Sequence, residues 1–84
     1  MSNKYLDKIE KNKDKYVIFY KPTCPYSRNA IKHLYNNNLS FKSYIIFNTQ
    51  KVVNKLNINH NTVPIIYYKG QFLGGYSELI KKNL

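Results

Sequence analysis

The segment YVIFYKPTCP, residues 16–25, decides the fold. Its first five residues form an unbroken apolar and aromatic run, which is typical of a strand buried on both faces. The next three residues predict a turn, and Pro25 suits the first turn of a helix, where its missing N–H removes no hydrogen bond. The segment therefore indicates an α/β fold in which Cys24 lies between a central strand and a helix.

Patterns on either side of this segment predict four helices and three further strands. In chain order the predicted elements are helix 2–14, strand 16–20, helix 26–36, strand 41–47, helix 50–57, strand 63–68, strand 72–73 and helix 77–83. The order (α)βαβαββα predicts a four-stranded mixed sheet flanked by helices on both faces, which resembles the thioredoxin-like fold. With 84 residues, the chain is expected to form one small domain, residues 1–84.

Apolar spacing predicts the buried side of the first two helices. The shared faces consist of Tyr5, Leu6 and Ile9 in helix 2–14 and of Ala30, Ile31, Leu34 and Tyr35 in helix 26–36. We expect helix 2–14 to pack on the edge of the sheet. Asn48 or Thr49 can cap the third helix, and Ser77 can cap the last one.

Composition excludes several classes of protein. The apolar runs are far shorter than the roughly 18 residues of a membrane span, and no N-terminal stretch suits a signal peptide. The single cysteine, Cys24, excludes a disulfide framework and a cysteine-rich zinc site within one chain. His33, expected to face outward, and His60, in a polar loop, have no partner at metal spacing and are assigned no role. We therefore expect a soluble, cytoplasmic, monomeric protein with no bound metal.

The chain is strongly basic. Fourteen lysine and arginine residues against four acidic ones give a formal charge of +10, which attracts anionic small molecules, acidic proteins, nucleic acids and anionic membranes. Base-reading proteins depend on arginine, and Arg28 is the only one, which argues against sequence-specific nucleic-acid binding. Arg28 and Lys32 are expected to raise the local positive potential near Cys24 without binding specifically.

Cys24 is the candidate nucleophile. A helix N-terminus offers free N–H groups and a partial positive charge, and Lys21 adds a full charge nearby, so both favour a thiolate. The thiolate is the form that attacks disulfides. A lone cysteine is often an inert core residue, but a cysteine flanked by proline and polar residues in a turn does not occupy a core position. This placement predicts a reactive thiol.

Three segments, in order, resemble those of glutaredoxins. Residues 20–27, YKPTCPYS, resemble the active-site segment, which commonly reads Cys-Pro-Tyr-Cys after a strand. Residues 62–64, TVP, match the family's Thr-Val-Pro loop, in which the proline is cis, and residues 74–78, GGYSE, match its glycine pair before a helix. The resemblance implies a thioredoxin-like fold and a glutathione-dependent thiol–disulfide oxidoreductase in cell redox homeostasis. Its partners would be glutathione, as co-substrate, and glutathionylated proteins, acidic ones included.

The resemblance also implies roles for single residues. Cys24 would attack the mixed disulfide, while Lys21 contacts the glycyl carboxylate of glutathione and helps to hold the thiolate. Val63 would pair its backbone with the cysteinyl part, and Ser77 and Glu78 would receive the γ-glutamyl group. The implied glutathione-binding set is Lys21, Cys24, Tyr26, Lys51, Thr62, Val63, Pro64, Gly75, Tyr76, Ser77 and Glu78, with Gln50 as the alternative to Lys51.

Ser27 stands where most glutaredoxins of this motif type have a second cysteine. Serine cannot resolve a mixed disulfide, so the resemblance implies a monothiol route: Cys24 removes glutathione from a protein, and a second glutathione releases it. Whether Ser27 is natural or an engineered replacement of a resolving cysteine stays open. The alternative function is a [2Fe–2S] dimer, in which two copies of Cys24 and two glutathiones supply four thiolates. Pro25-Tyr26 argues against it, since the family's dedicated cluster carriers have Gly-Phe there.

Overall fold

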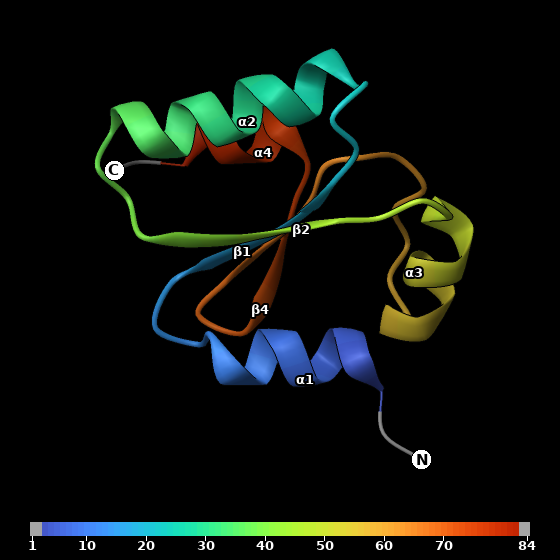
Figure 1. Ribbon diagram of the computed structural model, residues 1–84. Helices are drawn as coiled ribbons and strands as arrows, with labels where there is room; N and C mark the ends of the chain where they lie inside the picture. The colour runs from blue at the N-terminus through green and yellow to red at the C-terminus, as the bar shows by residue number, and fades with distance from the viewer. Residues whose placement is uncertain (1–2, 83–84) are drawn as a thin grey trace.

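The computed structural model describes residues 3–82 and contains one four-stranded sheet in the order β2-β1-β3-β4 (Figure 1). The strands are β1 (Tyr16–Tyr20), β2 (Phe41–Ile45), β3 (Ile65–Tyr68) and β4 (Gln71–Gly74), and the helices are α1 (Lys4–Lys11), α2 (Pro25–Asn36), α3 (Thr49–Leu56) and α4 (Tyr76–Lys81). β2 is parallel to β1, whereas β1–β3 and β3–β4 are antiparallel pairs. The predicted element order and mixed sheet are confirmed. Ser2 and Asn83, the outer ends of the first and last predicted helices, lie outside the described residues.

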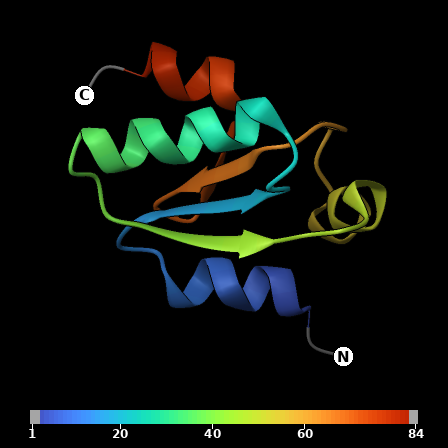
Figure 2. The same ribbon diagram turned by 45° about the horizontal axis from the view of Figure 1, so that its top comes forward.

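The sheet has a hydrophobic cluster on each face. α2 and α4 cover one face, where Ile18 of β1 packs in a cluster with Leu34 (Figure 2). α1 covers the opposite face and α3 lies at its end, where Phe19 of β1 packs in a cluster with Ile9 and Val52. Successive side chains of a strand point to opposite faces, so β1 is buried on both sides, as its unbroken apolar run predicts.

The predicted edge position of the N-terminal helix is wrong, because α1 lies on a face of the sheet (Figure 1). Ile9 is buried in the same cluster as Val17 and Phe19. At the C-terminal end of α1, the Asn12 side chain donates a hydrogen bond of 3.1 Å to the Tyr44 hydroxyl of β2. α3 is only eight residues long, so without α1 the large Phe19 ring would be left partly uncovered.

Two residues predicted to be buried on helices are exposed. Tyr35 of α2 is 74% exposed and Leu6 of α1 is 48% exposed. The buried stripe of α2 runs through Ala30 and Leu34, and Tyr35 lies one residue, or about 100°, beyond it. Apolar spacing therefore predicted the buried face of each helix correctly but included one exposed residue beside it.

The predicted strand 41–47 is two residues too long, because β2 ends at Ile45. The Ile46 N–H still donates to the Tyr20 carbonyl at 2.9 Å. Asn48 is the N-cap of α3, and its side chain accepts a hydrogen bond from the Lys51 N–H at 3.1 Å. The chain must leave the sheet to make this cap, and the residue at the bend, Phe47, is 88% exposed.

The hairpin between β3 and β4 turns on two residues. Lys69 and Gly70 have φ values of 52° and 82°, the left-handed pair of the type I′ turn that fits the twist of an antiparallel ribbon. β4 therefore begins at Gln71, one residue before the predicted strand 72–73, and runs to Gly74. This hairpin carries the chain back to the start of α4.

Candidate functional site

Cys24 is the N-cap residue of α2 and is partly exposed. The turn before it is closed by a 3.0 Å hydrogen bond from the Cys24 N–H to the Lys21 carbonyl, and the helix begins with a 3.1 Å bond from the Arg28 N–H to the Cys24 carbonyl. Pro25 occupies the first helical position, as the sequence predicts. The thiol is therefore positioned by a rigid turn at the positive end of a helix.

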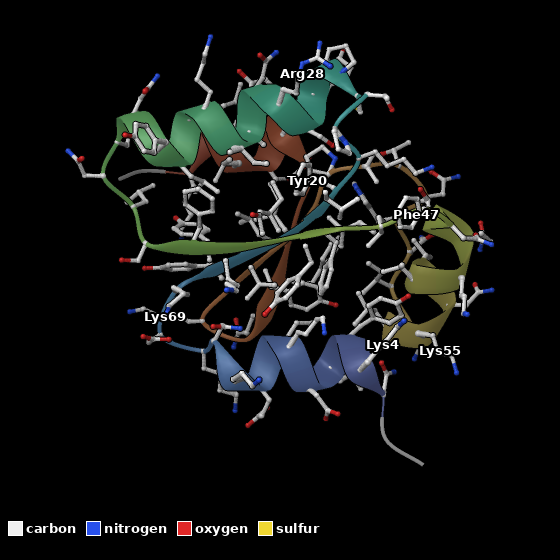
Figure 3. All side chains as sticks on the ribbon, viewed as in Figure 1. Lys4, Tyr20, Arg28, Phe47, Lys55 and Lys69 are labelled. Carbon is white, nitrogen blue, oxygen red and sulfur yellow. The ribbon has the colours of Figure 1, made fainter. Side chains whose placement is uncertain are left out.

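The surroundings of Cys24 favour its thiolate. Burial acts to raise the pKa of the thiol, but the Ser27 N–H and hydroxyl, the Tyr26 N–H and the charge of Arg28 lower it, and the net pKa lies below the ordinary value of a cysteine. Arg28 lies at the start of α2 (Figure 3), where its guanidinium donates a 2.9 Å hydrogen bond to the Pro22 carbonyl. The positive charge that lowers the pKa of the thiol is that of Arg28, one of the two cations expected to raise the local potential, whereas the full charge nearby was expected from Lys21.

The titration of the thiol tests this assignment. The rate of alkylation by iodoacetamide follows the thiolate, so its midpoint is expected at a lower pH than for an ordinary cysteine, about 8.5. Arg28→Ala removes a positive charge that favours the thiolate and should move the midpoint to higher pH. Lys21→Ala is the control and should leave it in place; a larger shift for Lys21→Ala than for Arg28→Ala would contradict the assignment.

Ser27, three residues after Cys24, is fully buried. Its hydroxyl oxygen accepts a hydrogen bond from the Lys21 N–H at 3.4 Å and also interacts with Cys24. The side chain that stands in the position of a resolving cysteine therefore faces the thiol. It can stabilise a thiolate but cannot form a disulfide with it.

A groove of about 230 Å³ begins beside the thiol. Its lining consists of Tyr26, His60, Thr62, Val63, Pro64, Gly75, Tyr76, Ser77 and Glu78. The Cys24 sulfur lies 3.8 Å from the Val63 carbonyl oxygen, and the Val63–Pro64 peptide is cis, as expected. The Tyr26 and Tyr76 rings flank one side with centroids 6.1 Å apart. The groove thus joins the segment after Cys24 to the two other segments that the sequence singled out.

The far end of the groove is the start of α4. The Glu78 carboxylate accepts a 2.7 Å hydrogen bond from the Gly75 N–H, and this bond is the main reason that its pKa lies below the ordinary value. Gly75, not the predicted Ser77, is the N-cap residue of α4. The preceding Gly74 has φ of +134°, and a Cβ there would lie 2.6 Å from Glu78 Cγ. Only glycine at this position leaves room for the carboxylate.

His60 belongs to the groove although the sequence analysis assigned it no role. Its Nε2 lies 3.3 Å from the Pro64 carbonyl oxygen, which can only accept, so a hydrogen bond between them uses the tautomer with a proton on this nitrogen. The ring packs edge-on against Phe72, with centroids 5.5 Å apart, and a Cβ on Gly75 would meet it at 3.2 Å. The His60 ring therefore packs between the residue 60–64 loop and the N-cap of α4. The sequence feature that could have indicated that His60 belongs to the groove is its position two residues before Thr62.

Lys21, Gln50 and Lys51 do not line this groove. Lys51 is exposed on α3 and lines a separate hollow on the side of α1. The Gln50 amide donates to the Asn54 side chain at 2.9 Å. His33 does not simply face outward, because its Nε2 is buried and has no hydrogen-bond partner among the described residues.

Two kinds of feature are absent from residues 3–82. No cluster of three or more histidine, cysteine or acidic side chains in this part of the chain could hold a metal ion. None of the helices described here has both the length and the apolar character that crossing a membrane requires.

Comparisons with known proteins agree with this arrangement. The family model described as Glutaredoxin matches residues 16–73. A probable glutaredoxin of Acanthamoeba polyphaga mimivirus is 37% identical over 79 residues, covering 79% of this chain and 74% of the viral protein. Glutaredoxin-1 of Variola virus is 38% identical over 78 residues, covering 81% of this chain and 70% of that protein. Among solved structures, glutaredoxin 1 from Francisella tularensis, complexed with cacodylate, aligns with a TM-score of 0.74 and 28% identity over 80% of this chain and 88% of that one, so the fold is thioredoxin-like.

Proposed function

The chain belongs to the glutaredoxin family and is a thiol–disulfide oxidoreductase, and from this premise we propose that it is glutathione-dependent and acts by a monothiol mechanism. The observation that carries the proposal is the pairing of a Cys24 thiol of lowered pKa with a buried Ser27 beside it. Cys24 supplies the attacking thiolate. Ser27 cannot form the intramolecular disulfide by which a dithiol enzyme would release its product.

The proposed reaction consists of two thiol–disulfide exchanges. The Cys24 thiolate attacks the glutathione sulfur of a protein–glutathione mixed disulfide, a Cys24–glutathione disulfide forms, and the protein leaves as a thiolate that takes up a proton. A second glutathione thiolate then attacks the glutathione sulfur of that intermediate. Oxidised glutathione leaves and Cys24 returns as the thiolate, so that one reduced glutathione is oxidised for each protein thiol released and Cys24 undergoes no net change.

The groove supports glutathione as the bound group. Val63, which lies two residues before β3 and not inside it as the predicted strand 63–68 had it, brings its backbone carbonyl to within 3.8 Å of the sulfur, where a tripeptide can pair with the backbone. At the far end, Ser77 and the carboxylate of Glu78 offer polar groups for the γ-glutamyl ammonium and carboxylate. Lys21, outside the groove, remains the candidate for the glycyl carboxylate. Recycling by reduced glutathione suits a reducing compartment such as the cytoplasm.

Substrate preference tests the monothiol mechanism. The protein is expected to reduce the mixed disulfide of glutathione and cysteamine in a glutathione-coupled assay. It should reduce insulin disulfides at least about 100-fold more slowly, because no second thiol acts intramolecularly at high effective concentration. Ser27→Cys places such a thiol beside Cys24 and should raise the rate on insulin. Rapid insulin reduction by the parent protein would contradict the monothiol mechanism, and no turnover of the small mixed disulfide would contradict the proposed function itself.

A further inference from the structure

Among the described residues, the large hydrophobic side chain with the highest exposed fraction is that of Phe47, at the bend between β2 and α3. Phe47, labelled in Figure 3, is 88% exposed, and Ile45, two residues before it, is 50% exposed. Both residues line two adjoining hollows of about 350 and about 400 Å³. We call these two hollows with Phe47 between them the Phe47 surface. An exposed apolar patch of this kind commonly marks a site of protein contact.

The rim of the Phe47 surface is positively charged. Lys4, Lys8 and Lys51 line the first hollow, and Lys21 lines the second. The Lys8 ammonium lies 4.9 Å from the centroid of the Tyr44 ring, a cation–π contact that holds its charge beside the hollow. None of the described residues that line either hollow is acidic. An apolar centre with a basic rim is complementary to a segment that carries both an apolar side chain and carboxylates.

The Phe47 surface also adjoins the reactive thiol. Thr23, the residue directly before Cys24, lines the second hollow, whereas Tyr26 and Val63 line the groove proposed for glutathione. The surface and the groove share no lining residue, and Lys21, the candidate for the glycyl carboxylate, lies on the surface where the two sites meet. The thiol therefore lies on the chain between a site suited to glutathione and a site of different chemistry, as the attack on a mixed disulfide between glutathione and a protein requires.

We infer that the Phe47 surface docks the protein part of the substrate, an acidic segment with an apolar side chain next to its glutathionylated cysteine. This inference rests on the proposed function and names the substrate class of the same site. The apolar side chain packs against Phe47 and Ile45, and carboxylates of the segment pair with Lys4 and Lys8, whereas Lys21 stays with the glycyl carboxylate of glutathione. When Cys24 has taken the glutathione, the protein thiolate leaves from this surface and its proton comes from solvent. A nucleic acid would use the lysines but not the apolar centre.

Three short glutathionylated peptides test the inference. In the first, the modified cysteine is flanked by leucine and glutamates; in the second, lysines replace the glutamates; in the third, serine replaces the leucine. At low ionic strength, kcat/KM for the first peptide is expected to exceed that for the second by about tenfold, and added salt should reduce this difference. Phe47→Ser should lower kcat/KM for the first peptide by about tenfold and for the serine peptide much less. Lys8→Glu should lower it for the first peptide and raise it for the second.

Matched controls separate docking from folding and from the chemistry. Tyr35→Ser removes another exposed aromatic ring, and Lys42→Glu makes the same charge change on exposed Lys42 of β2; neither should change the preference among peptides. Turnover of the glutathione–cysteamine disulfide should stay unchanged in Phe47→Ser and Lys8→Glu, since neither residue lines the groove. Equal kcat/KM for all three peptides, with that small-substrate turnover intact, would overturn the docking inference alone. Loss of the small-substrate turnover in the parent protein would instead overturn the proposed function.

Discussion

Replacing Cys24 by alanine is expected to lower the turnover of glutathione mixed disulfides by at least about a thousandfold, the scale of losing a covalent nucleophile. Cys24 is the only cysteine of the chain, so no neighbouring thiol can take over the attack. The glutathione-coupled assay with the glutathione–cysteamine disulfide measures the rate. Mass spectrometry of the protein after incubation with oxidised glutathione should show one glutathione adduct in the parent and none in the variant.

Cys24→Ser is the matched control for size and polarity. Its hydroxyl stays protonated near neutral pH, so this variant should be as inactive as Cys24→Ala although it keeps a side chain at the same place. Thermal unfolding should be nearly unchanged in both, because the Cys24 side chain is only partly buried. Turnover close to the parent rate in either variant would contradict the proposed mechanism.

Phe19→Ala is expected to lower the free energy of unfolding by about 3–5 kcal/mol. Phe19 is fully buried on the central strand, where its ring meets Tyr5 edge-on and stacks on Tyr44, each with centroids 5.8 Å apart. The loss is large against the total stability of a chain of this length, roughly 4–13 kcal/mol. The melting temperature should fall by about 15 °C or more, as measured by circular dichroism.

Phe47→Ala is the control for this stability prediction. It removes the same side chain from a position that is 88% exposed, so the free energy of unfolding should change by no more than about 0.5 kcal/mol. Similar melting temperatures for the Phe19 and Phe47 variants would mean that the packing on the α1 side of the sheet does not support the fold. The same control shows that Phe47 can be changed for the peptide experiments without unfolding the protein.

The parts of the fold that could be predicted from the sequence depend on short-range patterns. The unbroken apolar run of β1 requires cover on both faces wherever the rest of the chain goes, and Pro25 starts a helix by its own geometry. The errors arose where distant segments compete. Phe47 looks like a strand residue, but the Asn48 cap draws the chain out of the sheet. The face on which α1 packs is decided by how much of that face α3 leaves uncovered, which no local pattern records.

The residues of the candidate site also fall into two groups: those in local motifs, which the sequence predicts, and those whose role depends on contacts between distant segments. Cys24 and the Thr62-Val63-Pro64 segment are contiguous motifs, and the structure brings both to one groove. His60, which was assigned no role, reaches Gly75 across a loop, and Arg28, which was expected only to raise the local potential together with Lys32, lies a full helical turn beyond the thiol. Their importance depends on which turn of a helix faces the sulfur and on how closely two segments approach, and both are properties of tertiary packing.

The two tyrosines on one side of the groove also allow ligand binding there to be followed by fluorescence. The chain contains nine tyrosines and no tryptophan, so its near-ultraviolet emission comes from tyrosine alone. Tyr26 is 62% exposed and its ring lies 6.1 Å from that of Tyr76 at the mouth of the groove. A peptide that binds in the groove against these two rings changes the solvent around two of the nine emitters at once. The protein thus carries an intrinsic optical reporter at its own binding site, with no brighter indole to mask it.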